Sequence, residues 1–477
     1  MTSHQTIVVE LGSSRIKVGF AGESKPRRVF NRNRNSTSDG CATTWTIDDV
    51  NDGMISGVCM WPSFYNYASL STVIPSAPRT NTIVGSTTLG VYEWEKTMYP
   101  LFSHILTSIL FIQRPSRHRI LLLINDFFPP RTFTEALHRV LLDYLNVGSV
   151  WLVNGGVYEG LYHLFQGMPA PSIASTIRTH AQVHLIVDIG TYEARVVASV
   201  EGSSTLADTC QTTDSGYQSF LCRVLSNYQD MGDDIVPTET KRPIVSTLDD
   251  ADAIVQAWIA LSSSSSFDTL PETNTISVSV GQASRTPRRQ TESETESTIH
   301  VSTQPLLDAF HEIYLNYTNP SSLIYAILTC VMTCPIDYRR PALQNTILLG
   351  GGAVALRDFR LPRDSTSAEN SCRGFGRQLE ISIKDACGAV REESNDDAEE
   401  VENKDNDAHN PSPIAKQHFR SLRDAVHGCA KPYRGNRIGG INVRYPDPFA
   451  ADLAAWIGGS VLGTMGYTQY RKKSLWE

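Results

Sequence analysis

The hydrophobic positions of the chain form two similar hairpin patterns, one near the N-terminus and one before the middle. Residues 8–23 read VVELGSSRIKVGFAGE, and residues 186–197 read IVDIGTYEARVV. In each, an apolar run ends near an acidic residue, a glycine-containing turn follows, and a second apolar run returns. This pattern predicts two antiparallel strands. Its repetition predicts two similar half-domains.

Apolar runs and helical spacing alternate along the rest of the chain. Short apolar runs predict buried strands at 119–124, 150–153 and 346–349, the last of which enters a glycine turn at 350–352. An alternating run predicts a further strand at 276–280. Apolar residues at helical spacing predict helices over 92–112, 132–145, 157–165, 305–317, 321–334 and 452–465. Thr132 and Thr134 are candidate N-caps of the second of these helices. The alternation is typical of an α/β fold.

Three polar segments interrupt the alternation. Residues 31–90 are rich in Ser, Thr, Asn, Gly and Pro, which predicts a variable region dominated by loops. Residues 282–298 are predicted to be a flexible loop. Residues 364–412, with an acidic stretch at 392–407, are predicted to be a disordered surface insertion.

Composition narrows the class of protein. The 477 residues are 41% hydrophobic, which is enough for a sizeable core, and the net charge of −8 argues against a nucleic-acid scaffold. The nine cysteines show no pairing pattern, and the N-terminus does not read as a signal peptide. These features predict a reducing cytosolic or nuclear compartment. The apolar run at 453–465 is too short and too rich in glycine to span a bilayer.

The first hairpin turn has the chemistry of a phosphate site. Gly12, Ser13 and Ser14 offer convergent backbone N–H groups, since glycine permits close approach and the serines add hydroxyl groups. Lys17, on the return strand, is the candidate cation for the phosphates. One such hairpin alone is more often an ordinary β-turn. The pair of hairpins, followed by a glycine-rich turn, favours a nucleotide site.

Two acidic residues and the later glycines complete the candidate site. Glu10 and Asp188 end their strands, where carboxylates can hold a hydrated Mg²⁺. Gly190 and Thr191 lie in the second turn. A flat adenine ring could approach the backbone at the later turn, which consists of Gly350, Gly351 and Gly352. The expected cofactor, if the site is retained, is ATP or ADP with Mg²⁺.

With these residues identified, the chain resembles the actin family. The segments that carry the resemblance follow the order of that family: VELGSSRIKVGFAGESKPR (9–27) for the first phosphate motif, LLLINDFFPP (121–130), IVDIGTYEARVV (186–197) for the second phosphate motif, SSSSSFDTLPETNTISVSVG (262–281), ILLGGGAVA (347–355) for the adenosine motif, and WIGGSVLGTM (456–465). Together they span nearly the whole chain.

The resemblance implies an actin-like two-lobed α/β fold, in which duplicated ribonuclease H-like domains, each with a five-stranded sheet, surround a nucleotide cleft. The implied subdivision is residues 1–31, 94–162 and 453–477 as subdomain 1, 32–93 as a divergent subdomain 2, 163–211 and 302–452 as subdomain 3 with the insertion 364–412, and 212–301 as subdomain 4 with the loop 282–298. The adenine contacts from 226–260 are not identified by this resemblance.

Departures from the family pattern bear on catalysis. Glu10 stands where the family has Asp, and Thr191 and Tyr192 replace an Asp and a Gly of the second motif. A Tyr192 ring that faced the cleft would fill the space of a phosphate, and one that turned away would leave a less permissive turn. Ungapped alignment places Gly155 where the family has the glutamine that orients the attacking water, which glycine cannot do. The resemblance therefore implies a protein without ATP hydrolysis, and not an enzyme.

The implied function is assembly. The 31–90 region lacks the family sequence of the loop that inserts into the next filament subunit, and the chain ends where the last helix of the family is expected. Such a subunit would cap a filament but not propagate it. Among divergent members, the pattern resembles the actin-related protein at the pointed end of dynactin, the actin-related protein ten class.

That resemblance implies a cytoplasmic, cytoskeletal protein. Its partners would be actin or other actin-related subunits, the pointed-end subunits of dynactin and, indirectly, dynein, with no direct nucleic-acid contact and no membrane insertion. An alternative is a nuclear actin-related subunit of a chromatin-remodelling complex. A chaperone or sugar kinase of the wider fold fits less well, because neither a substrate domain nor a catalytic aspartate can be placed.

Overall fold

In the computed structural model, the described residues are 5–12, 15–32, 45–47, 90–124, 129, 131–154, 183–200, 206–232, 245, 247–263, 275–280, 297–361, 374–388, 441–446 and 449–465. The chain divides into unit 1, formed by Met1–Thr179 and Leu453–Glu477, and unit 2, formed by His180–Asp452. The helix predicted at 157–165 and the acidic stretch 392–407 lie outside the described residues, as does nearly all of the loop 282–298.

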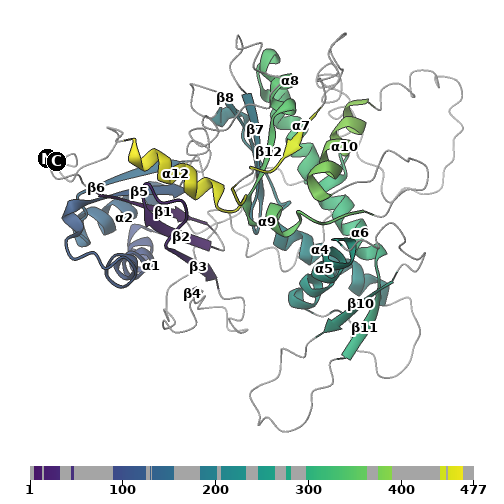
Figure 1. Cartoon of the computed structure of the whole chain (residues 1–477), viewed down its shortest axis with the longest axis horizontal. Coiled ribbons are helices and arrows are strands. Elements are labelled where there is room, and N and C mark those ends of the chain that lie inside the picture. Colours follow the sequence, from purple (N-terminus) through teal and green to yellow (C-terminus); the bar gives the residue numbers. More distant parts are fainter. Residues whose placement is uncertain are drawn as a thin grey trace, which may run out of the picture. The chain divides into compact units, whose positions relative to one another are not determined.

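Unit 1 is built on a sheet with the strand order β4-β3-β2-β1-β5-β6 (Figure 1). The strands are β1 (Gln5–Leu11), β2 (Arg15–Phe20), β3 (Arg28–Arg32), β4 (Trp45–Ile47), β5 (His118–Ile124) and β6 (Ser149–Asn154). β1, β2 and β3 pair antiparallel, whereas β5 and β6 run parallel to β1. The five strands implied by the resemblance are present, and the three-residue β4 adds a sixth at the edge.

Two helical regions and a C-terminal helix pack on this sheet. They are α1 (Val91–His104), which continues as a π-helical segment at Ile105–Ile109, α2 (Arg131–His138), which continues as a π-helical segment at Arg139–Tyr144, and α12 (Ala454–Thr464); a short 3-10 turn covers Pro115–Arg117. α12 lies along β1 and β5, where the fully buried Trp456 donates from Nε1 to the Val8 carbonyl oxygen at 3.4 Å. The helices predicted over 92–112 and 452–465 are thus confirmed.

The predicted N-caps of α2 are wrong. The helix begins at Arg131, so Thr132 and Thr134 lie inside it. The sequence has two prolines directly before Arg131, and proline is favoured at the first positions of a helix because it has no N–H to leave unbonded. This preference places the start earlier than the threonines suggest.

Unit 2 repeats the sheet topology of unit 1. Its strands are β7 (Val183–Ile189), β8 (Ala194–Val200), β9 (Gln211–Thr213), β12 (Thr346–Leu349) and β13 (Val443–Arg444), in the order β13-β12-β7-β8-β9. β7, β8 and β9 pair antiparallel, and β12 and β13 run parallel to β7. In both units an antiparallel meander is therefore extended by two parallel strands beside its first strand. This repetition confirms the two similar half-domains predicted from the hairpins.

Helices and a separate hairpin complete unit 2. They are a 3-10 turn at Ala207–Thr209, α4 (Tyr217–Gly232), α5 (Leu248–Ser263), the hairpin of β10 (Thr275–Val280) and β11 (Ser297–Ser302), α6 (Gln304–Phe310) with a π-helical segment at His311–Leu315, α7 (Leu323–Thr333), α8 (Ile336–Gln344), α9 (Gly350–Ala355) and α10 (Gly374–Gly388). Aromatic rings form the centre of the core, where Phe310 stacks on Phe359 with 4.1 Å between ring centres. Phe375 of α10 packs edge-on against Phe310.

The prediction of disorder over 364–412 is wrong for residues 374–388. These residues form α10, and their apolar side chains are buried in the core of unit 2: Phe375, Leu379, Ile383 and Ala386. Their spacing of four, four and three residues places them on one helix face. The surrounding Ser, Asp and Glu residues conceal this pattern when composition is averaged over the whole segment.

A buried histidine in β7 is expected to make unit 2 sensitive to acid. Burial, with a smaller contribution from the nearby charge of Arg444, lowers the pKa of His184 from 6.5 to about 4. Because the folded pKa lies below the unfolded one, the unfolded state takes up a proton more readily than the folded state. The contribution of neutral His184 to the free energy of unfolding is therefore complete above pH 6.5 and is lost as the pH falls toward 4. We expect a loss of about 2 kcal/mol in the free energy of unfolding between pH 7 and pH 5. Chemical denaturation at the two pH values measures it, and a His184→Gln variant with the same pH slope would contradict it.

Candidate functional site

The first predicted phosphate turn joins β1 to β2 in unit 1. The antiparallel register places Glu10 opposite Lys17, and the Gly12 N–H donates to the Arg15 carbonyl oxygen at 2.9 Å. Gly12 has no room for a side chain, because an added Cβ would lie 2.6 Å from that oxygen. The turn is therefore closed by its own backbone, and glycine is required at its first position.

Lys17 and Glu10 form a buried ion pair beside this turn. Lys17 Nζ donates to Glu10 Oε1 at 2.6 Å, and the two side chains are only 7% and 8% exposed. Burying a charge costs several kcal/mol unless an opposite charge accompanies it, so each side chain depends on the other. The predicted phosphate cation and the predicted Mg²⁺ carboxylate are therefore bonded to each other. A phosphate would have to compete with Glu10 for Lys17.

The second predicted turn joins β7 to β8 in unit 2. The Gly190 N–H donates to the Glu193 carbonyl oxygen at 2.9 Å, which is the same closure as in the first turn. Asp188 is buried at the end of β7 and lies opposite Arg195, which forms an ion pair with Glu193. The structure thus gives the second hairpin the turn geometry of the first, with an acidic residue at the strand end.

The start of α4 is bonded to the carbonyl groups of this second turn. Three successive carbonyl oxygens accept hydrogen bonds: Gly190 O from Tyr217 N at 3.1 Å, Thr191 O from Gln218 N at 2.6 Å and Tyr192 O from Ser219 Oγ at 3.2 Å. Gly216 packs so closely that an added Cβ would lie 2.2 Å from the Tyr192 carbonyl carbon. The backbone at Thr191 and Tyr192 is therefore fixed by α4, and both side chains are half-buried.

The glycines predicted to line the adenosine site form the start of α9, directly after β12. Gly350 has φ +91°, and an added Cβ would lie 2.3 Å from the Ile189 carbonyl oxygen and 2.4 Å from Asp188 Oδ1. A Cβ on Gly352 would lie 2.6 Å from Ile189 Cγ2, whereas Gly351 has nothing within 4 Å. Two of the three glycines thus pack against the end of β7, and the structure brings them together with Asp188 in unit 2.

Some predicted site residues lie outside the described part of the chain. These are Ser13 and Ser14 of the first turn and Gly155, the residue aligned with the water-orienting glutamine. Their roles stay predictions. Among the described residues, no three His, Cys, Asp or Glu side chains are grouped so that they could hold a metal ion. The described helices also include none that is long and apolar enough to cross a membrane.

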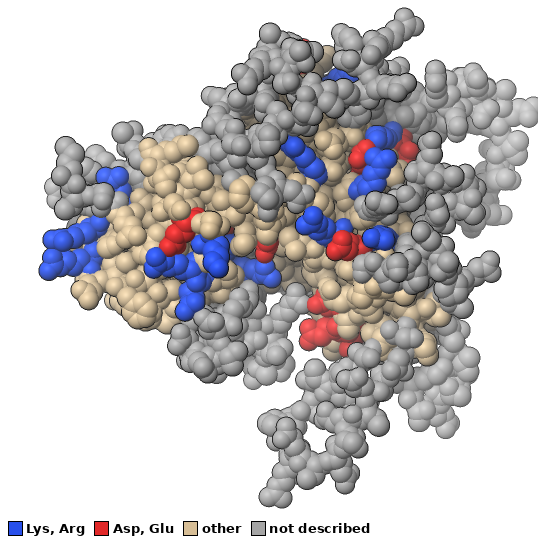
Figure 2. Space-filling view, in the orientation of Figure 1, with Lys and Arg blue, Asp and Glu red and all other residues tan. Residues whose placement is uncertain are grey.

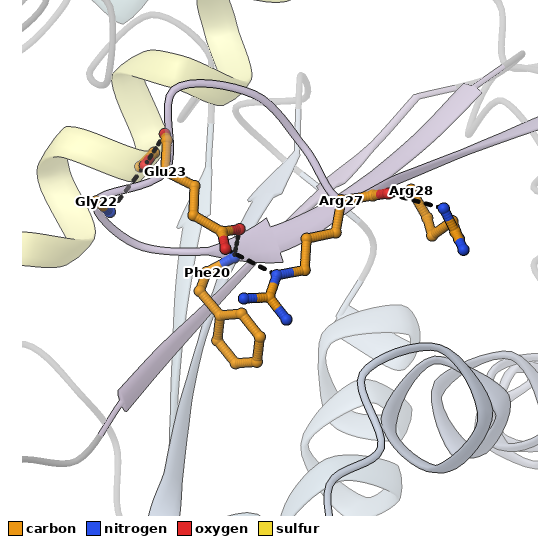
Figure 3. Close-up of polar contacts among 6 residues, drawn as sticks. Phe20, Gly22, Glu23, Arg27 and Arg28 are labelled. Carbon is orange, nitrogen blue, oxygen red and sulfur yellow. Dashed lines mark hydrogen bonds and ion pairs between the residues drawn. The ribbon is translucent and has the colours of Figure 1, made fainter.

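Hydrogen bonds connect the turn after β2 to α12 in unit 1 (Figure 3). Ser460 Oγ accepts from the Gly22 N–H at 2.9 Å and donates to the Glu23 carbonyl oxygen at 2.8 Å. The Glu23 carboxylate accepts from the Phe20 N–H at 2.8 Å and from Arg27 Nε at 2.7 Å. The Arg27 guanidinium lies 4.4 Å from the centre of the Phe20 ring. These contacts, which no local sequence pattern predicts, fix the C-terminal helix against the hairpin that carries the first turn.

We expect Ser460→Ala to lower the free energy of unfolding of unit 1 by about 1–3 kcal/mol. The hydroxyl is buried and makes two hydrogen bonds, so its removal leaves the Gly22 N–H and the Glu23 carbonyl without their best partner. Urea denaturation measures the change. Thr464→Ala is the control, because Thr464 lies on the same helix and is exposed. An equal effect of the two variants would contradict the expectation.

Comparison with known proteins agrees with this duplicated architecture. The family model described as Actin matches residues 1–237, which cover the first hairpin, the sheet of unit 1 and the second hairpin. A search of curated proteins finds no match to the chain. The match to just under half of the chain, together with the same mixed sheet topology in both units, supports an actin-family protein with an actin-like α/β fold.

Proposed function

We propose that this chain is a non-catalytic actin-related structural subunit that caps the pointed end of the actin-like filament of dynactin and supports dynein-driven transport on microtubules. The observation that carries the proposal is the second turn, where Thr191 and Tyr192 stand in place of the acid and glycine of the family pattern. The backbone of this turn is bonded to α4, so it is not free to move aside for a phosphate. A turn of this kind is more compatible with a structural subunit than with an enzyme that hydrolyses nucleotide.

Two further features support a loss of catalysis. The Lys17 ammonium is already paired with Glu10 at 2.6 Å, which weakens its attraction for a phosphate. The sequence has Gly155 at the position aligned with the water-orienting glutamine. Positioning the attacking water is a large part of phosphoanhydride hydrolysis, so a glycine there removes a major catalytic contribution.

Nucleotide retained without turnover is compatible with this proposal. The candidate contacts for ATP or ADP with Mg²⁺ are Gly12, Ser13, Ser14 and Lys17 of unit 1, and, separately, Asp188, Gly190, Thr191 and the glycines 350–352 of unit 2. The candidate Mg²⁺ ligands through water are Glu10 of unit 1 and Asp188 of unit 2. Asp188 fits this role, since it is a buried carboxylate close to Gly350. Lys17 fits only after it exchanges Glu10 for a phosphate.

The catalytic part of the proposal is tested by phosphate release. We expect purified full-length protein to release phosphate from ATP at the background rate. The control is Asp188→Asn, because any authentic turnover should depend on that carboxylate. Steady release that Asp188→Asn abolishes would contradict the proposal. Denaturing the purified protein and analysing the released small molecules shows separately whether ATP or ADP is bound.

Affinity purification with mass spectrometry tests the assembly part. We expect the tagged chain, expressed at its native level, to recover dynactin subunits, including those of the pointed end, and an actin-related filament protein. Recovery of a chromatin-remodelling ATPase without dynactin would instead support the alternative, a nuclear actin-related subunit of a remodelling complex. Imaging of the tagged protein then distinguishes a cytoplasmic, cytoskeletal location from a nuclear one.

A further inference from the structure

The two long helical regions of unit 1 end in the same backbone conformation. Both π-helical segments are followed by a residue with φ +52°, Phe111 after the first and Asn146 after the second. The hydrogen bonds around these residues also match: Leu110 N to Ile105 O at 3.0 Å and Ile112 N to Leu106 O at 2.7 Å, against Leu145 N to Val140 O at 2.9 Å and Val147 N to Leu141 O at 2.9 Å. The same type of helix end therefore occurs twice in unit 1, with phenylalanine at the left-handed position in one and asparagine in the other.

Phenylalanine is poorly suited to this position. Helices that end in a left-handed residue use glycine most often and asparagine next, because a Cβ crowds the backbone there and only a short polar side chain offsets this by local hydrogen bonding. Asn146 follows this preference, and Phe111 does not. The Phe111 side chain is also 77% exposed, so it gains little from burial within the chain. An unfavourable backbone conformation that presents an aromatic ring to solvent points to a functional role.

The surroundings of Phe111 are basic. Arg114 and Arg117 follow it in the same loop and are exposed. The Gly148 N–H donates to the Pro115 and His118 carbonyl oxygens at 3.3 and 3.1 Å, which joins this loop to the one that carries Asn146. Neither 110–119 nor 145–151 contains an acidic residue. On unit 1, at the left of Figure 2, Lys and Arg side chains gather near the edge of the view. We call Phe111, Arg114 and Arg117 the Phe111 surface.

We propose that the Phe111 surface docks an acidic protein segment that carries an apolar side chain between its carboxylates. Arginine and aromatic residues are enriched at the centres of protein interfaces, and arginine pairs with carboxylates in a bidentate geometry. The turn fixes the backbone at Phe111 before binding, so little conformational entropy is lost when the ring is covered. A membrane surface would need a longer apolar face than a single phenylalanine. The surface belongs to unit 1 alone and does not depend on the dynactin assignment.

Fluorescence anisotropy with the full-length protein tests this proposal. The first probe is a labelled peptide with two phenylalanines flanked on each side by four Asp or Glu residues, and the second replaces the phenylalanines by glycines. We expect saturable binding of the first probe that is weakened about tenfold by Phe111→Asn, which corresponds to about 1.4 kcal/mol. The second probe and an Arg114→Gln/Arg117→Gln variant should show a similar loss. Binding should also weaken as the salt concentration rises.

The variants are matched to control for folding and for general hydrophobicity. Phe111→Asn copies the residue that the second helix end already uses, so we expect it to fold and to be at least as stable as the parent chain. Tyr92→Asn removes a different exposed aromatic ring, on α1, that is 71% exposed, and this variant should leave binding unchanged. Absence of saturable binding, or equal binding by Phe111→Asn, would overturn the proposal. Binding to phosphatidylserine vesicles that these variants abolish, without peptide binding, would also overturn it in favour of a lipid surface.

Discussion

Gly350→Ala is expected to lower the free energy of unfolding by about 2–4 kcal/mol. Gly350 has φ +91°, a conformation that costs a residue with a Cβ about 1–2 kcal/mol. The added Cβ would also lie 2.3 Å from the Ile189 carbonyl oxygen, and relief of such overpacking costs about 1–3 kcal/mol. Because Ile189 is the last residue of β7, the backbone cannot give way without disturbing the turn between β7 and β8.

Gly351→Ala is the matched control. It changes the neighbouring residue in the same way, but an added Cβ there meets nothing within 4 Å. Alanine in a helix is favoured over glycine by roughly 0.5–1 kcal/mol, so this variant should be as stable as the parent chain or slightly more stable. Urea denaturation followed by circular dichroism compares the two. Equal stability of both variants would show that the close packing against β7 is not important for the fold.

The sheets of both units could be predicted from the sequence because their central strands are buried on both faces. β5 and β7 consist almost entirely of buried residues, so each gives an uninterrupted apolar run. The hairpins β1–β2 and β7–β8 add glycine turns at the correct positions. A pattern that is both local and apolar therefore locates the first strands of each half-domain, and the order of the remaining elements then favours the α/β class.

Elements whose burial depends on distant partners were predicted less well. α10 lies within a polar stretch, and the apolar face of this helix is recognisable only once the rest of the core of unit 2 is known to cover it. The two bonds of Ser460 join residues 438 and 437 positions apart, a separation that no local pattern can encode. The position of Ser460 in α12 was predicted, but its two hydrogen-bond partners could not be.

In the candidate site, too, the contacts of single side chains could not be predicted from local sequence. Residue types at the two turns indicated a phosphate site, and the structure places Gly12, Gly190 and Thr191 at the turns as the hairpin pattern requires. The pairing of Lys17 with Glu10 depends on the exact register of β1 and β2, which the hairpin pattern alone leaves open. The bonds from α4 to the second turn depend on how that helix packs against the turn, which the local spacing of apolar residues does not specify.

Lys17→Met is expected to have the largest effect on stability, a loss of about 3–5 kcal/mol. The substitution keeps an unbranched side chain, one atom shorter, but leaves the Glu10 carboxylate, which is 8% exposed, without its lysine. Removing one partner of a buried ion pair is strongly destabilising, because the charge that remains has lost both its solvation and the opposite charge beside it.

Two comparisons separate this effect from loss of the methylene packing of lysine. The double variant Glu10→Gln/Lys17→Met removes both charges and should recover most of the lost stability, since replacing both partners of a buried pair is often close to neutral. Arg139→Met breaks an exposed ion pair with Glu135, in which the side chains are 48% and 36% exposed, and a longer contact of 3.6 Å with Glu95. Because Arg139 is itself half-exposed, this variant should cost about 1 kcal/mol or less. If Lys17→Met were as mild as Arg139→Met, the buried pair would not stabilise the first turn, and Lys17 would be available to bind a phosphate at little cost.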